Sequence, residues 1–101
     1  MTPPAPIRAL VLVTADPRVD GRAREALRMA IGLTLAELAV TVALTGDAAD
    51  ALRDATTAWV DEPETRRHLA TLEQVGATLV IDPSPEGLLD LVLAADRVVT
   101  W

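Results

Sequence analysis

The chain has 101 residues, a formal net charge of −6, and neither cysteine nor lysine. This length fits one domain and is too short for two, so residues 1–101 are predicted to form a single domain. The acidic balance argues against a nucleic-acid partner, which binds a basic surface. The missing cysteine excludes disulfides, thiolate metal sites and cysteine nucleophiles, and the missing lysine excludes Schiff-base chemistry.

Half of the residues are hydrophobic, but the apolar runs are short. None approaches the ~20 residues of a membrane span, so no membrane partner is expected. The proline-rich residues 1–6 do not resemble a signal peptide and are expected to be disordered. A cytoplasmic location is therefore the expectation.

The first half of the chain alternates between two periodicities. Residues 7–14 form a nearly continuous apolar run, which is typical of a strand buried on both faces of a parallel sheet. Residues 20–35 carry apolar side chains at helical spacing, with Asp20 as the expected N-cap. Residues 38–45 predict a second strand, and Asp47 is expected to cap a short helix that extends to Arg53.

The second half repeats this alternation after a loop at residues 56–63. A helix is predicted over residues 64–75 and ends at Gly76, and a strand follows at residues 77–81. The Asp-Pro-Ser-Pro sequence at 82–85 predicts a rigid turn. Residues 86–95 predict a last helix and residues 97–101 a last strand. The inner side of that helix is expected to comprise Leu88, Leu89, Val92 and Leu93.

Alternating strands and helices predict right-handed parallel crossovers. The expected fold is an α/β three-layer sandwich with a mostly parallel sheet of four to five strands. A flavodoxin-like strand order of 2-1-3-4 is expected, which makes the first and third strands neighbours.

Ligands of such sheets bind at the carboxyl ends of the strands. Asp16 and Arg18 follow the first strand, and Asp82 and Ser84 follow the third. With these strands adjacent, the four residues are candidate ligand-binding residues, and their carboxylates suit a divalent cation. The competing and favoured interpretation is that the aspartates start turns and cap helices. No catalytic residue, resident metal or cofactor is assigned.

Three further side chains have simple structural interpretations. His68 lies on the third helix beside two arginines and has no evident partner in the sequence, so an exposed or interface position is expected. Trp59, in the loop before that helix, is expected to pack or to contact another subunit. Trp101 is expected to cover the sheet edge or an interface.

Three segments resemble the DsrE/TusD-like family of bacterial sulfur-relay proteins. They are residues 21–30 (GRAREALRMA), residues 75–81 (VGATLVI) and residues 94–101 (AADRVVTW). The resemblance implies a DsrE-like fold and the family's tendency to form homo-oligomers or mixed assemblies. It implies a persulfide relay through a cysteine just after the third strand, and that position falls near Asp82 here. A carboxylate cannot hold a persulfide, so sulfur transfer is not expected.

Two hypotheses follow from this resemblance. In the first, the chain is a non-catalytic DsrE-like subunit that acts in partner binding, assembly or regulation, with a link to sulfur metabolism. It would be a homo-oligomer, with other sulfur-relay proteins as candidate partners. In the second, it is a ligand-binding or metal-binding protein, or an enzyme, that uses the acidic loop around Asp16 and Asp82 in the former cysteine pocket.

Overall fold

The structure is a computed structural model that describes residues 5–16, 21–53 and 63–101. The expected disorder of residues 1–6 falls mostly outside these ranges, as does the loop at 56–63. The described elements are β1 (Arg8–Val13), α1 (Arg22–Leu35), β2 (Ala39–Leu44), α2 (Gly46–Arg53), α4 (Pro63–Gln74), β3 (Thr78–Ile81), α5 (Pro85–Ala94) and β4 (Arg97–Thr100). Each begins and ends within two residues of its predicted bounds.

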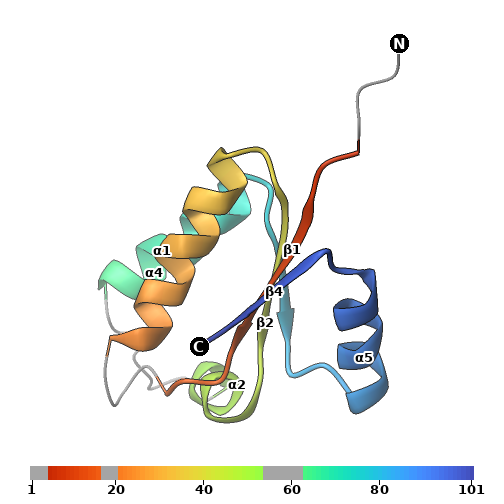
Figure 1. The fold of residues 1–101 in the computed structure, drawn as a ribbon. Coiled ribbons are helices and arrows are strands. Elements are labelled where there is room, and N and C mark those ends of the chain that lie inside the picture. The colour runs from red at the N-terminus through yellow and green to blue at the C-terminus, as the bar shows by residue number, and fades with distance from the viewer. Residues whose placement is uncertain (1–4, 17–20, 54–62) are drawn as a thin grey trace.

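The four described strands form one parallel sheet in the order β3-β2-β1-β4. The predicted α/β layering is confirmed, but the predicted order 2-1-3-4 is wrong. Helices α1 and α4 lie on one face of the sheet and α5 lies on the other (Figure 1). Right-handed crossovers on one face move the chain steadily in one direction, from β1 to β2 to β3. A crossover on the opposite face reverses that direction and returns the chain to the far side of β1.

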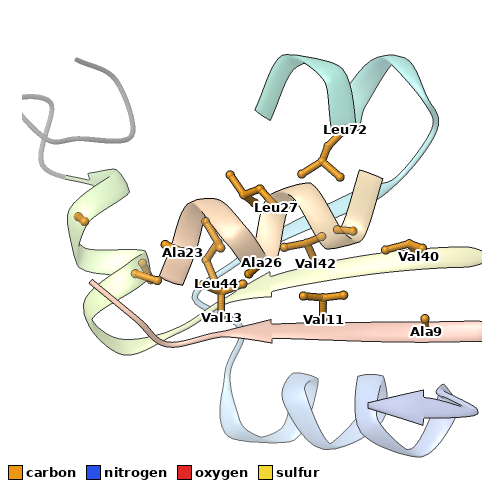
Figure 2. Packing of buried hydrophobic residues seen from close by; sticks show 14 residues of the cluster. Ala9, Val11, Val13, Ala23, Ala26, Leu27, Val40, Val42, Leu44 and Leu72 are labelled. Atoms are coloured by element: carbon orange, nitrogen blue, oxygen red, sulfur yellow. The ribbon is translucent and has the colours of Figure 1, made fainter. Parts of the chain in front are cut away.

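The main core lies between α1 and the two central strands (Figure 2). Three of its four fully buried α1 residues are alanines, and the sheet beneath contributes mostly valines. Small side chains on the helix allow its backbone to approach the sheet closely, which compensates for the absence of phenylalanine and tyrosine. The residues that these three elements contribute to this core are Ala9, Val11, Val13, Ala23, Ala26, Leu27, Ala30, Val40, Val42 and Leu44. Leu10 and Ala43 are also buried, outside this cluster.

Helix α5 is apolar around most of its circumference, yet none of its residues is fully buried. Leu88 and Leu91 are half-buried. The predicted inner side was wrong for three of its four residues, because these three are exposed: Leu89 at 56%, Val92 at 39% and Leu93 at 74%. Glu86 and Asp90 are four residues apart and share one side of α5, and Leu88 and Leu91 lie on the opposite side. The two acidic residues are therefore the sequence signal that identifies the inner side of this helix.

The helix ends follow local backbone chemistry. Gly76 ends α4 with a φ of 90°, and its N–H donates to the carbonyl of Glu73 at 3.2 Å. The N-cap of α1 is Gly21, which has no side-chain cap bond, and the predicted cap Asp20 lies outside the described residues. Among the helices that the structure describes, none is long and apolar enough to cross a membrane.

Candidate functional site

The observed strand order moves the expected ligand position to the carboxyl edge between β1 and β4. Helix α1, which follows β1, lies on one face of the sheet, and α5, which leads into β4, lies on the other (Figure 1). The strand order therefore changes direction at this pair of strands, which makes it the topological switch point of the sheet. The residues after β1 at this edge are Thr14, Ala15 and the half-buried Asp16. Trp101 follows β4.

The backbone of Trp101 spans this position. Its N–H donates to the carbonyl of Leu12 at 2.8 Å, and its carbonyl accepts from the N–H of Thr14 at 2.7 Å and of Ala15 at 3.2 Å. The Thr14 hydroxyl donates to the same carbonyl at 2.9 Å. The side chain of Trp101 is half-buried against the core. The sequence predicts that Trp101 covers the sheet edge or an interface, and the structure shows its side chain packed against the core.

Asp16 and Asp82 follow strands that are not neighbours. Strand β2 separates β1 from β3, so these two strands stand two strand spacings apart, about 10 Å. The predicted adjacency of the first and third strands is therefore wrong. Asp16 is half-buried, whereas Asp82 is exposed. The other two candidate ligand residues are Arg18 and Ser84. Arg18 lies outside the described residues.

Asp82 is the first residue of the turn that follows β3. Its N–H donates to the carbonyl of Leu44 at 2.8 Å, so it continues the pairing of β3 with β2. Its φ of 51° lies in the left-handed region, which aspartate tolerates better than most residues. These features agree with the interpretation of Asp82 as a turn residue.

Ser84 is the N-cap of α5. Its hydroxyl oxygen accepts a hydrogen bond from the N–H of Gly87 at 3.0 Å, and Pro85 is the first residue of the helix. This is the usual arrangement for a serine cap followed by a proline in the first turn. A Cβ at position 87 would stand 3.2 Å from the Ser84 hydroxyl oxygen, a tight contact. Glycine at this position therefore leaves space for the cap hydrogen bond. The hydroxyl has a structural partner of its own.

Replacing Ser84 by alanine is expected to lower the free energy of unfolding by about 1 kcal/mol, because the Gly87 N–H loses its acceptor. Replacement by aspartate keeps an acceptor at the cap and is expected to retain most of the stability. Urea unfolding of the three proteins measures both effects. Equal losses in the two variants would show that the cap does not stabilise α5.

Two other side chains singled out in the sequence are His68 and Trp59. His68 is half-buried on α4, and its neighbours Arg66 and Arg67 are exposed. Trp59 lies outside the described residues. Within residues 5–16, 21–53 and 63–101, no three histidine or acidic side chains are grouped as metal ligands would be.

Among the described residues, two of the hollows away from the carboxyl edge lie between a helix and the sheet. One, of about 300 Å³, lies between the end of α5 and the sheet, where Thr41, Thr78 and Leu91 are among its lining residues. The other, of about 540 Å³, lies between α4 and β3 and is lined mainly by Leu69, Leu72, Ala77 and Leu79. Sequence reasoning missed both, because each joins elements whose adjacency depends on the strand order and on the packing of the helices.

No protein-family model matches this chain, and no curated protein matches it significantly. Among solved structures, the YchN protein from E. coli is similar, with a TM-score of 0.75 and 19% sequence identity. The similarity covers 94% of this chain and 99% of that chain. YchN has a DsrE/TusD-like fold, and the likeness shows that this chain shares it.

Proposed function

We propose that this chain is a non-catalytic DsrE-like subunit that acts through assembly, partner binding or regulation, in a setting of sulfur metabolism. One observation carries the proposal: the chain combines a DsrE-like fold with the complete absence of cysteine. The fold supplies the scaffold of a sulfur-relay protein, and the sequence lacks the atom that such a relay requires.

The chemistry of position 82 supports this proposal. A relay group must attack a persulfide and later leave from one, which a polarisable thiolate does and a carboxylate does not. Asp82 follows β3, where the resemblance places the sulfur-accepting cysteine, and it is exposed. Its negative charge would also repel an anionic persulfide. The thioethers of Met1 and Met29 carry no exchangeable proton and cannot replace a thiol.

A ligand site built jointly from Asp16 and Asp82 receives less support. The two follow strands separated by β2, and Ser84 already accepts the cap bond of α5. Binding by these residues would therefore require a ligand long enough to reach across the end of β2. Assembly, in contrast, draws support from the large apolar side chains exposed on α5 and β3.

Incubation with a persulfide-loaded donor protein, followed by intact mass measurement, tests the proposal. The wild-type chain is expected to gain no mass. The Asp82→Cys variant places a thiol at the same exposed position and serves as a positive control for the donor. A gain of about 32 Da on the wild-type chain that reduction removes would show that it does accept sulfur.

A further inference from the structure

The edge strand β3 is short, at four residues, but its sequence has none of the charged or proline residues that often protect a sheet edge. Among the described residues it pairs only with β2, and it contains no charged residue, no proline and no glycine. Leu79 and Ile81 lie on the same side of the sheet as α4 and are exposed at 39% and 45%. Natural proteins usually interrupt such an edge with a lysine, a proline or a bulge. An uninterrupted apolar edge is therefore a surface suited to strand pairing.

The backbone groups of this edge are arranged for a new strand. The Asp82 N–H donates to Leu44 on β2, and backbone groups alternate in direction along a strand. The N–H and C=O groups of Leu79 and Ile81 consequently point away from β2, toward the open edge. The same two residues thus offer both the hydrogen-bonding groups and the exposed apolar side chains.

The surface next to this edge continues along α4. The hollow of about 540 Å³ between α4 and β3 includes Leu69, Ala70 and Glu73 from the helix. Arg66 is exposed and stands four residues before Ala70, so it lies on the same stripe of the helix as Glu73. This stripe has a positive charge at one end, a negative charge at the other and apolar side chains between them.

We propose that the β3–α4 surface is the contact between two copies of this chain, related by a two-fold axis through Val80. The inference rests on the homo-oligomeric assembly proposed above and specifies its interface. Antiparallel pairing about this axis places Leu79 of each copy opposite Ile81 of the other copy. Both are residues with outward backbone groups, so each pair exchanges two hydrogen bonds. Both also point to the α4 side, so the apolar side chains of the two copies meet.

Charge favours this self-pairing. Helix α4 runs antiparallel to β3 within its crossover, so Glu73 lies near the start of the strand and Arg66 near its end. The two-fold axis reverses the second copy and brings Glu73 of each chain toward Arg66 of the other. The competing apolar surface on α5 has only acidic charges, Glu86 and Asp90. Pairing of that surface with itself would place like charges together in a protein that already carries a net charge of −6.

Cysteine cross-linking tests the position of the axis, because the natural chain has no thiol to interfere. In Val80→Cys, the two thiols would lie on a non-hydrogen-bonded antiparallel pair with Cα atoms about 4.5 Å apart, within disulfide range. Val98→Cys is the matched control: it has the same side chain, lies on the same side of the sheet and stands on the other edge strand. Mild oxidation should convert most of the Val80→Cys protein to a covalent dimer and leave Val98→Cys monomeric on denaturing gels.

The outcomes separate this inference from the proposed assembly. Wild-type protein that sediments as a monomer at micromolar concentration would overturn both. Wild-type protein that associates while Val80→Cys stays reduced would overturn only the β3–α4 interface. Preferential cross-linking of Val98→Cys, or of Leu93→Cys on α5, would do the same and identify the surface that is used instead.

Charge reversal gives a second measurement that does not depend on a thiol. Arg66→Glu and Glu73→Arg should each raise the dimer dissociation constant by about ten-fold, because each places like charges across the axis. The double variant restores opposite charges and should recover most of the affinity. Equal dissociation constants for all four proteins in sedimentation experiments would contradict the proposed pairing.

Discussion

Replacing Leu27 by alanine is expected to lower the free energy of unfolding by about 3 kcal/mol. Leu27 is the largest of the fully buried side chains of α1 (Figure 2). Its neighbours are mostly alanines and valines, which are too short to fill the space that the deletion leaves. The loss therefore includes a cavity in addition to the apolar surface returned to water.

Leu35→Ala is the matched control, because Leu35 lies on the same helix and is 69% exposed. This control is expected to change the stability by less than about 0.5 kcal/mol. Chemical unfolding followed by far-ultraviolet circular dichroism compares the two variants. Similar losses in both would contradict the assignment of Leu27 to the core and Leu35 to the surface.

Replacing Ala26 by leucine is expected to destabilise the fold by about 2 kcal/mol. Ala26 is fully buried on the face of α1 that packs on β1 and β2. A larger side chain would push the helix away from the sheet or take an unfavourable rotamer. The addition of apolar surface would by itself stabilise the core, so the sign of the effect decides whether alanine is required for close packing.

Ala36→Leu provides the comparison, since Ala36 is exposed immediately after the same helix. It is expected to be nearly neutral in thermal unfolding. A melting temperature that rises in Ala26→Leu would show that the interface between α1 and the sheet can accommodate a larger side chain and is not closely packed.

The elements could be predicted from the sequence because their periodicities differ sharply. The apolar run at residues 7–14 and the helical spacing at residues 20–35 identify a buried strand and an amphipathic helix without further information. Gly76 marked the end of α4 for a local reason, its left-handed backbone conformation. The type and the ends of each element depend on residues within that element, so they could be predicted from the sequence.

The order of the strands in the sheet could not be predicted from the sequence in the same way. It depends on which face of the sheet each helix covers, and an apolar stripe shows only that a helix has an inner side. Helix α5 added a second error, because Leu89 and Leu93 were assigned to its inner side although they lie next to the acidic residues Glu86 and Asp90. The candidate site inherited this error: Asp16 and Asp82 were expected on neighbouring strands, and β2 lies between those strands. The cap role of Ser84 was missed as well, although Pro85 and Gly87 after it are the local signal that could have identified it.

Native mass spectrometry of the untagged protein from its own cells tests the central claim most directly, that this chain acts through assembly and not through sulfur transfer. The spectrum is expected to show a multiple of the 10.7 kDa chain mass, with unmodified chains after denaturation. A monomer, or chains that carry an extra sulfur of about 32 Da removable by reduction, would contradict that claim.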